Sequence, residues 1–70
     1  MKEITATMAG TVLNVLVSTG ENVSAGQEVL MLESMKMEIP IAAEFDGTVK
    51  EVKVAEGEFV NEGDVIVVVE

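Results

Sequence analysis

The feature that most constrains this chain is an internal repeat with an offset of 37 residues, which places Met8–Glu33 over Phe45–Glu70. Ten of the 26 aligned positions are identical, and the identities combine glycines, valines and turn positions. A solenoid needs at least ~3 repeats, because each unit buries its apolar face against the next one. Two copies therefore predict two half-domains that pack against each other within a single domain, residues 1–70.

Each half is predicted to be β-structure. Valine occurs 13 times, and β-branched side chains favour the pleated, half-buried surface of a sheet. Short apolar runs alternate with glycine-containing polar stretches, as in sandwiches and barrels. No extended apolar stripe of helical period is present, so we expect essentially no helix. The expected strands are 3–7, 11–17, 28–34, 37–43, 48–54 and 65–69, with very short strands at 22–23 and 59–60.

One spacing within the strands recurs in both halves. Val12, Val15 and Val17 are separated by three and then two residues, and the equivalent valines 37 residues later repeat this pattern. Strict alternation of side chains cannot place all three on one face. Either a β-bulge follows Val12 and Val49, or these two valines face outward.

Two matching segments, Gly20–Gly26 and Gly57–Gly63, are predicted to be turns. Their glycines supply positive φ angles, and the single valine inside each segment, Val23 or Val60, is expected to plug the core. A phosphate-binding loop is the alternative. It is disfavoured because no helix and no Gly-Lys-Ser/Thr motif follows.

The composition excludes several functions. The chain contains no cysteine and no histidine, which excludes disulfides, thiol nucleophiles and the commonest metal ligand and general base. The net charge of −9 disfavours nucleic acid and anionic membranes as partners. The longest apolar run has five residues, whereas a membrane span needs ~20. No signal-peptide core is present at the start, so we expect a cytoplasmic protein. An enzyme that uses paired carboxylates is also disfavoured, because no aromatic-lined cleft can form from two phenylalanines.

The segment Ser34–Glu44 belongs to neither copy of the repeat. Apolar strands approach it from both sides, which predicts a β-hairpin with Lys36 at or near its tip. Under a two-fold relation between the halves, the image of this linker is the gap between the chain ends. We therefore expect the lysine tip and the termini at opposite ends of the domain.

Lys36 is not expected to be a catalytic nucleophile, because a solvated lysine is almost fully protonated at neutral pH. It is accessible to another enzyme, or it is a solvated lysine without a role. Met35 and Met37 flank it. Methionine is flexible and common at surfaces that adapt to a partner, although two methionines at this spacing could also fill a core.

The run Glu33-Ser34-Met35-Lys36-Met37-Glu38 resembles the biotin-attachment motif of the biotinyl/lipoyl carrier domain family. The resemblance extends from about Met8 to Glu70 and includes Gly10-Thr11-Val12 and both glycine-flanked turn segments. It implies an all-β fold, a flattened barrel-sandwich hybrid of two four-stranded antiparallel sheets with quasi-two-fold symmetry. It also implies a non-catalytic carrier with biotin in amide linkage to Lys36.

The same resemblance implies the partners. A biotin protein ligase would attach biotin using ATP and would recognise Met35, Met37, Glu33 and Glu38. The biotinylated protein, expected to be a monomer, would carry carboxyl groups between a biotin carboxylase and a carboxyltransferase. The stretch between Val12 and Gly20 leaves no room for the protruding thumb of some carrier subunits. The chain is therefore more similar to thumbless carrier domains and to small free-standing attachment proteins.

The chain departs from the family pattern at two positions. Ser34 and Ala9 stand where the family most often has alanine and proline, and neither change puts modification in doubt.

Two alternative functions remain. One alternative is a lipoyl carrier, or a dual biotin and lipoate acceptor, of a 2-oxoacid dehydrogenase-type system. Lipoyl domains usually carry Asp-Lys-Ala or a similar triplet, which Met35 and Met37 do not match. The other is an unmodified structural adaptor with the same fold.

Overall fold

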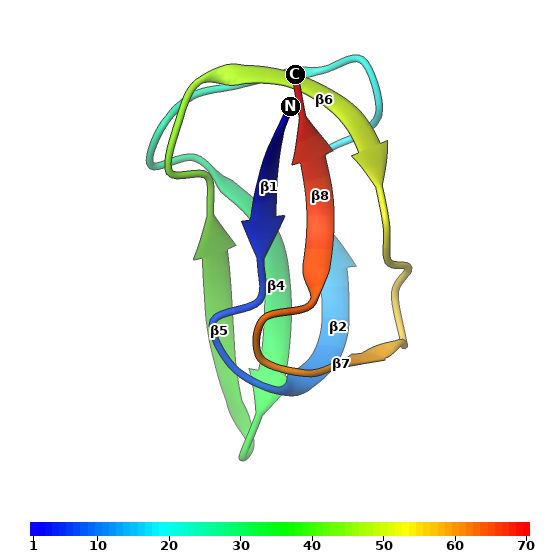
Figure 1. The fold of residues 1–70 in the computed structure, drawn as a ribbon. Coiled ribbons are helices and arrows are strands. Elements are labelled where there is room, and N and C mark those ends of the chain that lie inside the picture. The colour runs from blue at the N-terminus through cyan, green and yellow to red at the C-terminus, as the bar shows by residue number, and fades with distance from the viewer.

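The computed structural model describes every residue from Met1 to Glu70 and contains eight strands (Figure 1). The strands are β1 (Lys2–Thr5), β2 (Gly10–Val15), β3 (Asn22–Val23), β4 (Glu28–Ser34), β5 (Met37–Ala42), β6 (Gly47–Val52), β7 (Phe59–Val60) and β8 (Val65–Val69). All eight correspond to the predicted segments. None of the elements is a helix of the length and apolarity needed to span a bilayer.

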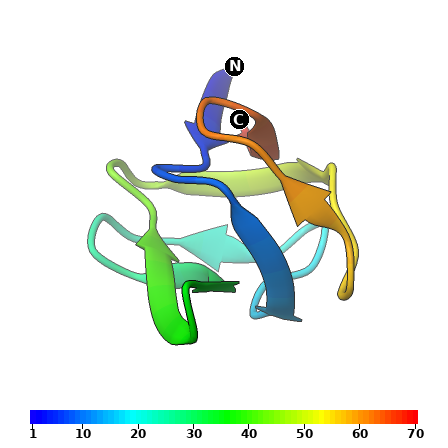
Figure 2. The ribbon, with the colours of Figure 1, turned by 90° about the horizontal axis from the view of Figure 1, so that it is seen from below.

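The strands form two four-stranded sheets, ordered β1-β8-β6-β3 and β5-β4-β2-β7. Every paired strand is antiparallel to its neighbour. Viewed from below, the sheets lie on opposite sides of a common core (Figure 2). This arrangement confirms the predicted barrel-sandwich hybrid.

The two halves are related by an exchange of backbone hydrogen bonds. The N–H of Gly20 donates to the carbonyl of Val49, and the N–H of Gly57 donates to the carbonyl of Val12, both at 2.8 Å. These two bonds are images of each other under the 37-residue offset. Each turn segment is therefore hydrogen-bonded to the opposite half of the repeat.

Of the two alternatives for the valine spacing, the structure shows the β-bulge, and it occurs in both halves. The register shifts between Val12 and Asn14 in the pairing of β2 with β4, and between Val49 and Glu51 in the pairing of β6 with β8. The bulge turns Val12 and Val49 inward, and each side chain is only 1% exposed. The alternative of outward-facing valines is thus wrong.

The turn segments also follow the prediction. Their four glycines have positive φ angles, which are 94° at Gly20, 90° at Gly26, 90° at Gly57 and 89° at Gly63. Val23 and Val60 are buried between the sheets. Glycine is favoured at these turns because a residue with a β-carbon rarely adopts a positive φ angle.

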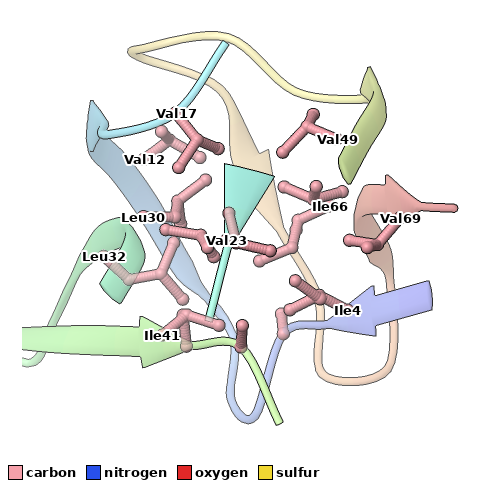
Figure 3. Close-up of a cluster of buried hydrophobic side chains, with 14 of the residues drawn as sticks. Ile4, Val12, Val17, Val23, Leu30, Leu32, Ile41, Val49, Ile66 and Val69 are labelled. Carbon is pink, nitrogen blue, oxygen red and sulfur yellow. The ribbon is translucent and has the colours of Figure 1, made fainter. Parts of the chain in front are cut away.

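The core is apolar and draws on both sheets (Figure 3). No charged or polar side chain is buried in it. Its members are Ile4, Ala6, Val12, Val17, Val23, Val29, Leu30, Leu32, Ile41, Ala43, Val49, Val60, Ile66, Val67 and Val69. Because the chain has no cysteine, this apolar packing holds the two sheets together without a disulfide.

Strands β2 and β6 end two residues earlier than predicted. Val17 is nevertheless buried, as its apolar character indicates. Three residues beyond each strand, the backbone N–H groups of Ser18 and Ala55 donate to the side chains of Glu21 and Glu58. These two N–H groups are therefore paired within the turn segments and not with a neighbouring strand.

Candidate functional site

Met35 and Lys36 form the two-residue turn that joins β4 to β5, and Ser34 and Met37 are the last paired residues before it. The hairpin extends at the end of the molecule opposite to the N- and C-termini (Figure 1). The molecule measures 31 × 19 × 18 Å. The predicted hairpin, the position of Lys36 at its tip and the separation of the tip from the termini are thus confirmed.

The tip has an unusual backbone. Met35 and Lys36 have φ angles of 53° and 64°, and they are the only non-glycine residues with positive φ. Positive φ at both central positions is the signature of a type I′ hairpin turn, in which Asn-Gly is the preferred sequence. Left-handed backbone at residues with a β-carbon costs about 1–2 kcal/mol each. The rest of the hairpin must hold this turn against that cost.

The side chains of the tip point into solvent. Met35 is 89% exposed and Met37 is 64% exposed, and Lys36 is also exposed. The single ion pair of the chain joins Lys53 to Glu51 at 3.3 Å, so the amine of Lys36 has no carboxylate partner. Core filling by Met35 and Met37 is therefore wrong, which leaves their apolar surface available to a partner.

The predicted recognition residues divide between two faces of the hairpin. Glu33 lies directly opposite Glu38, and Ser34 lies opposite Met37. Because side chains alternate along a strand, the two carboxylates project from one face and Met37 from the other. Met35 lies at the turn itself. A partner that contacts all four residues must therefore surround the tip.

The surface near the tip has no pocket, and no three acidic side chains of the chain gather as metal ligands would. What the tip offers chemically is one primary amine on a projecting turn, flanked by two thioethers. Such an amine can be acylated by a second protein that closes over it.

One residue beside this site was not associated with it by sequence analysis. Phe59 was assigned to a short strand within a turn segment and to no site. Its side chain is 64% exposed and lies in β7, which pairs with β2 at the tip end of the sheet. The repeat alignment held the available signal, because Phe59 aligns with the polar Asn22.

A family model for biotin/lipoyl domains, described as "Biotin-requiring enzyme", matches residues 2–69. The pyruvate carboxylase of Staphylococcus aureus is 46% identical over 67 residues, which cover 96% of this chain and 6% of that enzyme. The biotinylated protein TB7.3 homolog of Mycobacterium leprae is 40% identical over 68 residues, which cover 97% of this chain and 96% of that protein.

Solved structures give the same picture. The urea carboxylase of Kluyveromyces lactis matches with a TM-score of 0.92 and 26% identity over 99% of this chain and 6% of that one. The lipoyl domain of the 2-oxoglutarate dehydrogenase complex from Azotobacter vinelandii matches with a TM-score of 0.76 and 25% identity over 96% of this chain and 95% of that domain. The chain thus spans a small part of the two carboxylases and nearly all of the two small proteins.

Proposed function

Because this chain belongs to the biotin/lipoyl attachment domain family, we propose that it is a biotin carboxyl carrier modified on Nζ of Lys36. The observation that carries the proposal is the place of this lysine. It occupies a projecting two-residue turn between exposed methionines. Lys50 lies within β6, and Nζ of Lys2 lies 5.0 Å from the ring centroid of Phe45.

Attachment would form an amide bond between Nζ of Lys36 and the carboxyl group of biotin. A biotin protein ligase would drive this condensation with ATP. The chain's own contribution is to present the amine. The strained turn fixes the backbone at Lys36, and the absence of an ion pair at Nζ leaves the amine free to enter the active site of the ligase. Met35, Met37, Glu33 and Glu38 would supply the surrounding contacts.

The carrier itself would be non-catalytic. Biotin, when attached, supplies the ring nitrogen that takes up and releases a carboxyl group. The partners would be a biotin carboxylase and a carboxyltransferase, in keeping with the similarity to the pyruvate carboxylase of Staphylococcus aureus. A tethered cofactor raises its own local concentration at both partner sites, which requires only a rigid body and an exposed arm. We further propose that the carrier works in the cytoplasm as a monomer.

A lipoyl carrier, or an acceptor of both cofactors, is the second candidate. The observation that favours it is the similarity to a lipoyl domain along nearly the whole length of both chains. Met35 and Met37 favour biotin, because lipoyl domains usually carry an acidic residue and an alanine around the lysine. The two candidates share the modified residue and differ in the ligase that recognises it.

The proposal is tested by incubating the chain with a biotin protein ligase, ATP and biotin, followed by capture on streptavidin. We expect capture of the parent chain and of the matched control Lys50→Arg, and no capture of Lys36→Arg. The Lys36→Arg variant should remain folded, because an exposed side chain contributes little to stability. Capture of folded Lys36→Arg at the parental level would refute the assignment.

A further inference from the structure

A row of four residues crosses the outer face of the sheet β5-β4-β2-β7 at its tip end. Phe59 pairs with Thr11, Thr11 pairs with Glu33, and Glu33 pairs with Glu38. Directly opposed residues of antiparallel strands project from the same face. The neighbouring Val12 and Leu32 are buried, so this face points outward. We call Phe59, Thr11, Glu33 and Glu38 the cross-sheet row. It spans three strand spacings, roughly 14 Å.

The quasi-two-fold symmetry provides an internal comparison for Phe59. Its equivalent in the other half is Asn22, which pairs with Thr48 just as Phe59 pairs with Thr11. The hydroxyl of Thr48 donates to Oδ1 of Asn22 at 2.9 Å. A polar residue thus occupies the equivalent position in the other half, at the end of the molecule where the termini lie. The fold does not require an aromatic side chain at position 59.

Phe59 therefore exposes a large apolar surface without a structural reason. Phe59 belongs to β7, which lies at the same end of the molecule as the β4–β5 hairpin (Figure 1). Its side chain is 64% exposed. Exposed aromatic side chains that the fold does not need are typical anchors of protein interfaces.

The other end of the row carries uncompensated charge. Glu33 and Glu38 are both exposed and directly opposed, and like charges in this arrangement destabilise a sheet. No lysine of the chain lies within 4.0 Å of either carboxylate, because the only ion pair is that of Lys53 with Glu51. A cationic side chain from another protein would relieve this repulsion.

We propose that the cross-sheet row is a docking surface for the enzyme that acylates Lys36. The fitting partner surface is an apolar pocket for the Phe59 ring, bordered by arginine or lysine side chains that pair with Glu33 and Glu38. The inference rests on the proposed attachment at Lys36 and adds Phe59 and one specific face of the sheet to it.

The choice of partner follows from how close each enzyme must come to the turn. An enzyme that acts on the unmodified amine must bring its active site within one lysine side chain of the turn. Its surface therefore covers the strands that border the tip. Enzymes that act on a cofactor at the end of the extended arm can remain farther from the sheet. The row begins at Glu33 and Glu38, within three residues of Lys36, so it falls inside the footprint of the acylating enzyme.

The test is steady-state kinetics of biotinylation by a biotin protein ligase, with the carrier as the varied substrate. Phe59→Asn installs the residue that the other half already accommodates at this position. We expect it to raise KM for the carrier about tenfold, the loss typical of an aromatic anchor, with kcat unchanged. Glu33→Gln with Glu38→Gln should also raise KM and should flatten the dependence of KM on salt concentration.

Leu16→Asn is the matched control, because Leu16 is also an exposed apolar residue, 47% accessible, but it follows β2 at the end away from the tip. It should leave KM within twofold of the parent value. Equal KM for Phe59→Asn and the parent, or an equal rise for Leu16→Asn, would overturn the docking surface alone. Failure of the parent chain to be biotinylated would overturn the proposed function together with it.

Discussion

Gly10 lies so close to Glu33 that a β-carbon on Gly10 would stand 2.7 Å from the Glu33 carbonyl oxygen. The same relation recurs 37 residues later, where a β-carbon on Gly47 would stand 2.7 Å from the carbonyl oxygen of Glu70. In each half, glycine allows a central strand to approach its neighbour. At Gly10 that neighbour is β4, which leads into the turn that carries Lys36.

Replacing Gly10 by alanine should therefore destabilise the protein. The new methyl group would meet backbone, which cannot move aside as a flexible side chain can, and overpacking of this kind costs about 1–3 kcal/mol. In a domain of this size each kcal/mol lowers the melting temperature by roughly 4–8 °C. Gly47→Ala should show a similar loss and Ala9→Gly almost none. An unchanged melting temperature for Gly10→Ala would contradict the close approach.

The symmetric carboxylates Glu21 and Glu58 should contribute equally to stability. Oε1 of Glu21 accepts the N–H of Ser18, and Oε1 of Glu58 accepts the N–H of Ala55, both at 2.7 Å. Glu21→Ala and Glu58→Ala should each lower the free energy of unfolding by about 1 kcal/mol, measured in urea. The losses should add in the double variant, because the two bonds share no partner. Glutamine, which keeps an acceptor oxygen, should lose less, and a glutamine variant as unstable as alanine would argue against the hydrogen bond.

The strained turn predicts a variant that is more stable than the parent. Asparagine tolerates left-handed backbone better than methionine does, and Met35 is almost fully exposed. Met35→Asn should therefore raise the free energy of unfolding by about 0.5–1 kcal/mol. The same variant should be biotinylated more slowly, because it loses an apolar contact. A lower melting temperature for Met35→Asn would mean that the side chain of Met35 supports the hairpin.

The methionines should also determine which cofactor is attached. Met35→Asp combined with Met37→Ala introduces a carboxylate beside Lys36, as in lipoyl domains, and removes two flexible apolar contacts. Specificity is a difference between two affinities. We expect strongly reduced biotinylation and detectable lipoylation, followed by mass spectrometry in parallel time courses with a biotin ligase and a lipoate ligase.

Two results would oppose this prediction. If the double variant were biotinylated as fast as the parent, recognition would lie elsewhere, for instance in Glu33, Glu38 and Phe59. If the parent were already lipoylated efficiently, the protein would accept both cofactors.

The repeat explains why so much of the fold could be predicted from sequence. The matching spacing after Val12 and Val49 indicated that both halves share one solution, either a bulge or an outward-facing valine, and the structure has the bulge in both. The aligned glycines predicted two turn segments with positive φ angles. The break in the repeat placed Lys36 at a tip opposite the termini. These predictions succeed because the two halves share one backbone geometry, so a residue pattern that occurs in both halves is rarely accidental.

What could not be predicted depends on contacts that break the symmetry. Asp46 accepts the N–H of Ala25 at 2.8 Å, across 21 residues, and its equivalent Ala9 has no acceptor side chain. The left-handed backbone of Met35 and Lys36 runs against their residue preferences, so it follows only from the register of β4 with β5. The outward orientation of the Phe59 side chain likewise follows from the pairing of Phe59 with Thr11. This pairing joins distant parts of the chain, so no local sequence pattern predicts it.

The most direct test of the central claim is the intact mass of the chain after reaction with a biotin protein ligase, ATP and biotin, followed by peptide mapping. The account predicts a complete shift by one biotinyl group, located on Lys36 and on none of Lys2, Lys50 or Lys53. An unshifted mass, or a biotinyl group on one of the other three lysines, would contradict it.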